Sequence, residues 1–232
     1  MPRVYISPSM QKHNVGLPPF ANEEFQMNTI ADIIMDLLVK DGRFTVKRND
    51  SSMNDVYSIA QDSNNFKADI HVAIHSNAGG GVGTEVFAYG PNTNSERLGQ
   101  ALYNQIAPLS PGVDRGVKYN PNLIEVGNYV KATSALIEIA FHDSQADATW
   151  IVTSHQSIAN GLYKGICDFY GFDYRVTVVA LPVTPLVTPV AIKGPIAPDD
   201  IYLSVRVRES LADQAIKDIN KLGFAAQRLE LA

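Results

Sequence analysis

The sequence is poor in cysteine, in long apolar runs and in clustered positive charge. Its 232 residues include one cysteine, Cys167, so neither an intramolecular disulfide nor a cysteine-based zinc cluster can form. Cys167 falls in an apolar helical pattern, and we expect it in the core. No run of about 18 apolar residues occurs, so we expect no membrane span. The formal net charge is −5 and no long basic run is present, which gives no support to nucleic-acid binding.

The N-terminal segment also lacks a leader-like pattern. Residues 1–7 become polar within a few positions and contain no apolar stretch of the kind that a signal peptide requires. We therefore expect no signal peptide. Hydrophobic residues make up 45% of the chain, which is enough for a sizeable core in one medium domain with a small appendage.

Strand and helix patterns alternate over residues 1–174. This alternation predicts an α/β domain with a twisted, mostly parallel sheet flanked by helices. We expect strands over residues 4–7, 44–47, 68–75, 84–89, 123–126 and 135–140, and helices over 23–40, 95–106 and 158–169. Residues 51–60 are expected to form a short helix or a turn. Asn22 is the expected N-cap of the first helix, and Gly42 is the expected residue that ends it. Sites in such sheets form beyond the carboxyl ends of the strands, where His75 and Glu138 are expected to lie.

The composition changes after Tyr174. Residues 175–198 are rich in proline, interleaved with valine and alanine, and predict an extended linker. Residues 199–232 then alternate as a strand, a helix and a strand. A β-α-β unit of this size is too small to bury a proper core alone.

Three residues could act as metal ligands: His13, Glu24 and His75. A zinc hydrolase needs about three nitrogen and oxygen ligands and one open position for water. His13 follows the first strand, Glu24 lies in the first turn of the first helix, and His75 ends the third strand. All three are expected near one edge of the sheet. Their spacing matches no generic zinc motif, so a solvated histidine and a helix-stabilising glutamate remain the alternative interpretation.

Four segments together resemble a known family. They are Ile74-His75-Ser76-Asn77-Ala78 with Gly83-Thr84-Glu85-Val86, Asn22 to Asn28, Asp114-Arg115-Gly116-Val117 and Ala135 to Phe141. Their order and spacing are similar to those of the zinc-dependent N-acetylmuramoyl-L-alanine amidases of the amidase-3 group. The resemblance covers roughly residues 3 to 171.

The resemblance implies one Zn2+ per chain, bound by His13, Glu24 and His75, with Glu138 as the catalytic carboxylate. The glutamate register is ambiguous: we choose Glu24, with Glu23 as the alternative. The approach to His13 is longer than the Asp-x-Gly-His turn usual in the family. The implied reaction is hydrolysis of the amide bond between N-acetylmuramic acid and L-alanine in peptidoglycan, causing cell-wall lysis.

Several other polar residues have open roles. Asn77 and Arg115 are candidate substrate or supporting groups, with a surface ion pair as the equal alternative for Arg115. His142 is a candidate for lining the cleft or contacting substrate. His71 lies about 13 Å from His75 along the strand, too far to share a metal, so we expect it to be packed or at an edge. His155 is expected at the surface, before the last helix.

The C-terminal β-α-β unit weakly resembles half of a SPOR-like peptidoglycan-binding fold. We expect two chains to pair these units into a homodimer; docking of the unit on its own catalytic domain is the alternative. A catalytic domain, a linker and a wall-binding module without a signal peptide resemble a phage endolysin, which stays in the host cytoplasm until it is released to the wall. A sporulation enzyme is the alternative origin. The rival functions are a zinc peptidase acting within the stem peptide and a non-catalytic peptidoglycan-binding protein.

Overall fold

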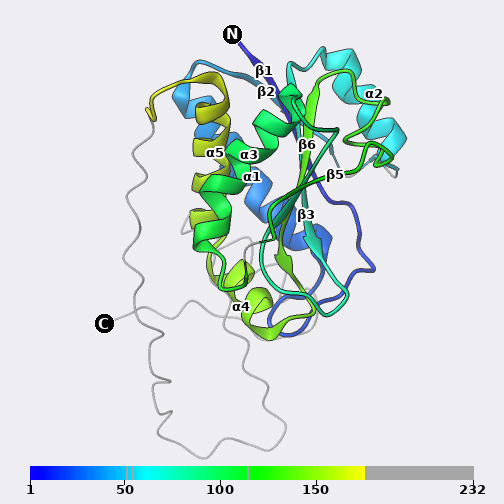
Figure 1. Ribbon diagram of the computed structural model, residues 1–232, viewed down its shortest axis with the longest axis vertical. Helices are drawn as coiled ribbons and strands as arrows, with labels where there is room; N and C mark the ends of the chain where they lie inside the picture. Colours follow the sequence, from blue (N-terminus) through cyan, green and yellow to red (C-terminus); the bar gives the residue numbers. More distant parts are fainter. Residues whose placement is uncertain (51, 54, 114, 176–232) are drawn as a thin grey trace, which may run out of the picture. The chain divides into compact units, whose positions relative to one another are not determined.

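A single mixed sheet organises the part of the chain that the structure describes. The computed structural model describes residues 1–175 apart from 51, 54 and 114. Within these residues six strands form one sheet, in the order β2-β1-β3-β6-β4-β5 (Figure 1). The strands are β1 (Arg3–Pro8), β2 (Thr45–Arg48), β3 (Ile70–Asn77), β4 (Glu85–Ala88), β5 (Val117–Tyr119) and β6 (Thr133–Phe141). Apart from residue 175, the predicted linker and C-terminal module lie outside the described residues.

Most neighbouring strands run parallel. The β1–β2, β1–β3, β3–β6 and β4–β5 pairs are parallel, and β4 pairs with β6 antiparallel. The expected mostly parallel α/β sheet is therefore confirmed. The helices are α1 (Glu23–Asp41), α2 (Val56–Phe66), α3 (Asn94–Ile106), α4 (Gln145–Thr153) and α5 (His155–Tyr170), with a 3₁₀ turn at Ala107–Leu109.

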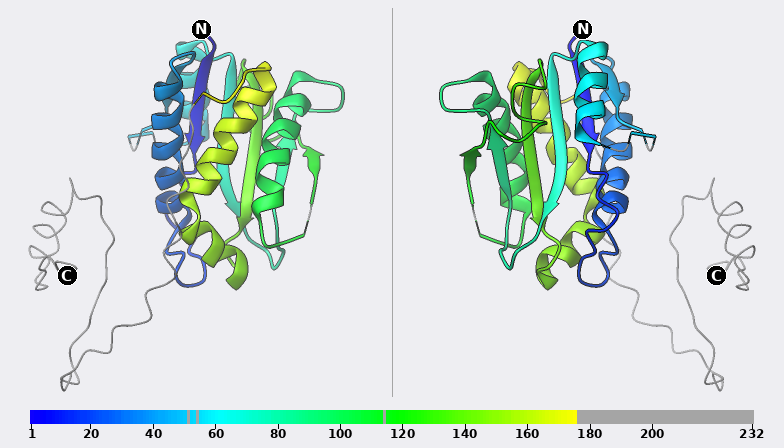
Figure 2. Two further views of the ribbon diagram at one scale, coloured as in Figure 1. Left: turned by 90° about the vertical axis from the view of Figure 1, so that its left-hand side faces the viewer. Right: turned by 90° about the vertical axis from the view of Figure 1, so that its right-hand side faces the viewer.

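The two faces of the sheet differ in chemistry. Side chains alternate along a strand, so Ile70, Val72 and Ile74 of β3 point to one face, and there they join the main hydrophobic core. Helices α1, α3 and α5 cover that face, whereas α2 lies on the opposite side (Figure 2). The other face holds only a small apolar cluster around Ala73 and Leu136, and polar side chains occupy much of the remainder.

Helix α1 begins and ends as its sequence predicts. The Asn22 side chain accepts a hydrogen bond from the Phe25 backbone N–H at 2.9 Å, which satisfies one of the donors left open in the first turn. Gly42 ends the helix in the left-handed conformation, with a φ of 76°. This N-cap fixes the position of the two glutamates that follow it, Glu23 and Glu24.

Some local expectations were wrong. Residues 123–126 form turns rather than a strand, with the Gly127 N–H donating to the Leu123 carbonyl at 2.7 Å. Helix α2 begins at Val56, five residues later than expected, because Asp55 caps it through the N–H groups of Tyr57 and Ser58. Strand β5 and helix α4 were not predicted, and both are short.

Candidate active site

A row of ionisable side chains crosses the polar face of the sheet. His75 on β3 is the register partner of Glu138 on β6, and Glu138 is also the partner of Glu85 on β4. Side chains at paired positions project to the same face, so these three groups are neighbours. The row lies toward the carboxyl end of β3, as the sequence predicts for a site in this fold.

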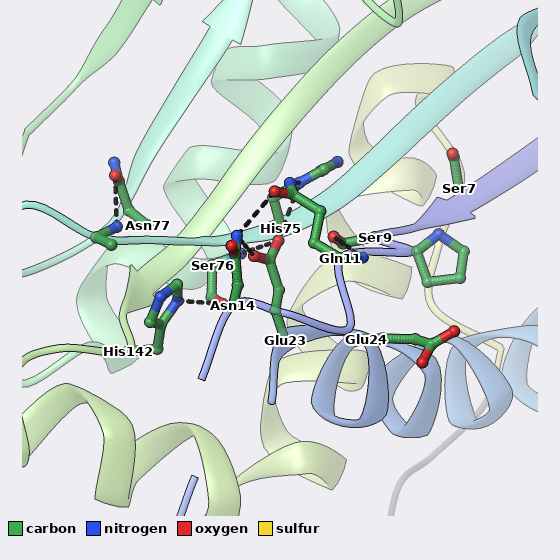
Figure 3. A network of polar contacts seen from close by, with 12 residues as sticks. Ser7, Ser9, Gln11, Asn14, Glu23, Glu24, His75, Ser76, Asn77 and His142 are labelled. Carbon is green, nitrogen blue, oxygen red and sulfur yellow. Dashed lines mark hydrogen bonds and ion pairs between the residues drawn. The ribbon is translucent and has the colours of Figure 1, made fainter. Parts of the chain in front are cut away.

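His75 is held on both ring nitrogens. Its Nδ1 lies 3.0 Å from Glu23 Oε1, and its Nε2 lies 3.4 Å from Glu125 Oε2 (Figure 3 shows the Glu23 side). The imidazole is buried, which alone would lower its pKa. The carboxylates of Glu125 and Glu23 outweigh that effect and raise the pKa of His75 well above 6.5. Two carboxylates therefore fix the orientation of this ring.

Of the two neighbouring glutamates, Glu23 is the one at the site. Its side chain is buried, while that of Glu24 is directed elsewhere and lies 3.8 Å from Lys12 Nζ (Figure 3). Burial tends to raise the pKa of Glu23, but contact with His75 and bonds from Asn14 and Ser9 lower it overall. The arrangement thus favours the alternative register, with Glu23 in place of Glu24.

The loop after β1 brings amides to the site rather than an imidazole. Gln11 Nε2 lies 3.3 Å from His75 Nδ1, and Asn14 Nδ2 donates to Glu23 Oε2 at 2.7 Å. His13 is exposed on the same loop. Within the described residues, no group of three or more His, Cys, Asp or Glu side chains is placed to hold a metal ion. The structure therefore does not bring His13, Glu24 and His75 together.

Glu125, which lies in a turn, contacts two histidines on the polar face of the sheet. The sequence did not predict this role. Its Oε1 accepts from the Ser7 hydroxyl and lies 3.2 Å from His71 Nε2, while its Oε2 faces His75. His71 is buried, as expected, with its Nδ1 3.1 Å from Ser63 Oγ. Burial would raise the pKa of Glu125, but the two histidines lower it far below its usual range. A glutamate between apolar residues in a predicted strand was the only sequence signal for this role.

Glu138 is the least satisfied polar group at the site. Its Oε2 is buried with no hydrogen-bond partner among the described residues. Burial raises the pKa of Glu138 to about 7; His75 lowers it, whereas Glu23 and Glu85 add to the rise. A carboxylate in this condition is suited to exchanging a proton near neutral pH.

Two of the three candidate substrate residues bind Glu85. Asn77 Nδ2 donates to Glu85 Oε1 at 2.7 Å, and Arg115 Nε donates to Oε2 at 2.6 Å. Lys118 pairs with the same carboxylate. Burial would raise the pKa of Glu85, but Lys118 and Arg115 lower it overall. Asn77 and Arg115 therefore hold the carboxylate beside Glu138.

The third candidate, His142, and two other residues, His155 and Cys167, pack within the domain. His142 is buried, lies 2.9 Å from Ser76 Oγ and stacks on Phe20. His155 was expected at the surface, and this was wrong: it starts α5, is half-buried and lies 2.6 Å from Gln26 Oε1, and burial lowers its pKa. Cys167 is buried, as expected. Within the described part of the chain, no helix has the length and apolar character to cross a membrane.

Comparison with known proteins agrees with this fold. Residues 4–168 match the amidase-3 family model, described as N-acetylmuramoyl-L-alanine amidase. The chain therefore belongs to the N-acetylmuramoyl-L-alanine amidase family, whose members act on peptidoglycan. No curated protein matches the sequence closely enough to be counted as a relative.

Solved structures share the architecture. The catalytic domain of the amidase CwlV from Bacillus (Paenibacillus) polymyxa var. colistinus is 21% identical, with a TM-score of 0.66, and the match covers 75% of this chain and 100% of that one. An amidase from Clostridium difficile 630 is 21% identical, with a TM-score of 0.63 over 73% of this chain and 97% of that one. The catalytic domain of the CD27L endolysin, which targets Clostridia difficile, is 20% identical, with a TM-score of 0.60. The match covers 72% of this chain and 98% of that one.

Proposed function

We propose that this amidase depends on one zinc ion per chain and that its action lyses bacterial cell walls. The observation that carries the proposal is the buried His75 ring, fixed between Glu23 and Glu125 beside the unpartnered Glu138 oxygen. Histidine and carboxylate are the donors that catalytic zinc sites use. A histidine whose second nitrogen meets a carboxylate is also typical of zinc ligands, and Glu125 supplies that carboxylate to His75.

The residues present therefore fit zinc. Glu23 and His75 would contribute two of the ligands, and a third would come from the loop after β1, whose side chains reach them. When bound, zinc would supply Lewis acidity, polarising the scissile carbonyl and lowering the pKa of water to about 7. The proton transfers of the reaction would be carried out by side chains of this chain.

Glu138 is the proposed proton carrier. Its carboxylate takes a proton from the attacking water as the water oxygen bonds to the lactyl carbonyl carbon of N-acetylmuramic acid. It then passes that proton to the nitrogen of L-alanine as the C–N bond breaks. The products are a free lactyl carboxylate on the glycan and a free amino group on the stem peptide. A pKa of about 7 suits both steps near neutral pH.

Replacing Glu138 tests this role. Glu138→Gln is expected to retain zinc but to lower turnover by at least about 100-fold, the usual scale for loss of a positioned proton carrier. Metal analysis and the rate of release of free L-alanine amino groups from purified walls measure the two quantities. Glu96→Gln, at the N-terminal end of α3, makes the same chemical change away from the site and should keep full turnover. Full turnover in Glu138→Gln would contradict the assignment.

Product analysis separates the rival functions. Mass spectrometry of digested walls should show stem peptides with free L-alanine amino groups and intact glycan strands. Cleavage within the stem would indicate a zinc peptidase, and the absence of any new ends would indicate a non-catalytic peptidoglycan-binding protein. The presence of Glu138 beside His75 favours catalysis over binding alone.

The biological setting that we propose is a phage endolysin. The similarity to the CD27L endolysin catalytic domain supports it. Such an enzyme stays in the host cytoplasm until release and then degrades the wall. Expression in the cytoplasm of a sensitive host, with and without a separate membrane-permeabilising protein, tests this setting: lysis should require the second protein.

A further inference from the structure

The loop after β1 places an amide where an imidazole was expected. Gln11 Nε2 is 3.3 Å from His75 Nδ1, and that same nitrogen is 3.0 Å from Glu23 Oε1. The side chains of Gln11, Glu23 and His75 thus converge on one point, from the β1–α1 loop, from α1 and from β3 (Figure 3). Because an amide oxygen can bind a metal ion, this trio is a complete set of three donors.

We propose that the side-chain oxygen of Gln11, and not His13, is the third protein ligand of the zinc ion, together with Glu23 and His75. The proposal rests on the zinc dependence proposed above. The proposed ligand set is one imidazole, one carboxylate and one amide. The sequence led us to expect two imidazoles and one carboxylate.

Asn14 positions the Gln11 amide. Its Nδ2 donates to Gln11 Oε1 at 2.8 Å and to Glu23 Oε2 at 2.7 Å, so it connects two members of the trio. The Asn14 carbonyl also accepts from the Glu23 N–H at 2.9 Å, which ties the loop to the start of α1. A half-turn about the Cγ–Cδ bond of Gln11 exchanges its oxygen and nitrogen. It would direct the oxygen to the place where Nε2 now meets His75, and the hydrogen bond from Asn14 Nδ2 to Gln11 Oε1 would be given up in exchange for the metal.

His13 lies on the same turn as Gln11, and the two residues line one pocket together with Asn14. The Asn14 N–H donates to the Gln11 carbonyl at 3.3 Å and closes this turn, in which Gln11, Lys12 and His13 are all exposed. The polar contacts within the described residues connect Gln11 and Asn14, but not His13, to the site.

The donor set predicts a measurable difference. An amide oxygen is neutral and binds zinc less strongly than an imidazole nitrogen, so Gln11→His should tighten zinc binding by adding a better ligand. Gln11→Ala should weaken it at least about tenfold, because even residues that only hydrogen-bond to a metal ligand are worth about 10–100-fold in metal affinity. His13→Ala, the matched control on the same exposed turn, should change the affinity less than about twofold, since His13 makes no polar contact with Glu23, His75 or Gln11 among the described residues.

Zinc K-edge X-ray absorption of the full-length zinc-loaded chain tests the proposal, with affinity measured by competition with a chromophoric chelator. We expect the multiple-scattering signal of one imidazole in the unmodified chain and of two in Gln11→His. Two imidazoles in the unmodified chain, with one lost in His13→Ala, would overturn the proposal. So would an unchanged affinity in Gln11→Ala.

His75→Ala separates this proposal from the function on which it rests. Loss of zinc in that variant, together with either overturning result, would leave zinc dependence standing and reject only Gln11. Retention of full zinc affinity in His75→Ala would reject the zinc site itself. Circular dichroism of each variant confirms that the domain is folded.

Discussion

At the scale of single residues, two adjacent glutamates illustrate how position on a helix decides a role. Successive residues of an α-helix differ by about 100° in direction, so Glu23 and Glu24 cannot share a face. Glu23 is buried against His75, whereas Glu24 is partly exposed near Lys12. The two side chains are chemically identical, but only that of Glu23 contacts His75.

This pair allows a matched test. Glu23→Gln is expected to weaken zinc binding by more than about tenfold, because it removes a charged donor, and Glu24→Gln is expected to leave it within about twofold. Equilibrium dialysis followed by metal analysis measures both. A large loss in Glu24→Gln with none in Glu23→Gln would restore the register that the sequence first suggested.

Some residues of the site could be predicted from the sequence, and others could not. His75 and Glu138 were placed together correctly because both lie at the end of a strongly apolar strand, and their register pairing confirms that they are neighbours. Gln11, Asn14 and Glu125 were missed because amides and single glutamates occur on every protein surface. Their importance comes from contacts over up to 118 residues of sequence, as between Ser7 and Glu125, which no local pattern encodes.

At the scale of elements, a buried ion pair connects the end of α1 to the middle of α5. The Arg43 guanidinium binds Asp41 with Nε and Nη2, each at 2.6 Å, and the Tyr163 hydroxyl of α5 donates to the same carboxylate at 2.7 Å. The hydrogen bonds from Arg43, more than those from Tyr163, hold the pKa of Asp41 below 3.8 despite its burial. This contact fixes the carboxyl end of α1 against the long final helix.

The sign of the resulting pH dependence follows from linkage. The pKa of Asp41 is lower in the folded state, so its contribution is fully present above about pH 4 and is lost as the pH falls through the folded-state pKa. Asp41→Asn should reduce the free energy of unfolding at pH 7 by about 2 kcal/mol, because it leaves Arg43 without its partner. It should also flatten the loss of stability as the pH falls below about 4.

Urea denaturation at a series of pH values measures both effects. Asp32→Asn is the control, since Asp32 pairs with Arg48 but its side chain is 74% exposed, and it should change stability little. An equal acid dependence in the Asp41 variant and the unmodified chain would contradict the assignment.

The elements themselves differed in how well they could be predicted. Helix α1 was predicted almost to the residue because its cap, its apolar spacing and its final glycine agree. Strand β5 has three residues and helix α4 has nine, and both depend on packing against β4 and β6 rather than on their own periodicity. The segment around Leu123 is apolar enough for a strand, but it turns back so that Glu125 can reach His71.

At the scale of the whole molecule, the family match ends well before the chain does. It covers residues 4–168, and residues 199–232 carry the predicted β-α-β unit. The prediction that two chains pair through this unit concerns residues outside those described. Sedimentation of the full chain and of a shortened chain ending at Tyr174 tests it: the full chain should have twice the monomer mass, and the shortened one should be monomeric. Equal monomeric behaviour would reject pairing.

The opposite characters of the two sheet faces have a practical consequence for protein engineering. Cohesion comes mainly from the side covered by α1, α3 and α5, while the reactive side chains of the strands, His75, Glu85 and Glu138, project from the other side. A mutagenesis library confined to the reactive side should therefore sample new metal preferences and new amide substrates without spoiling the fraction of clones that fold. The sheet separates the residues that stabilise the fold from the strand residues at the site. Substitutions selected for activity on one face therefore need not lower the stability that the other face provides.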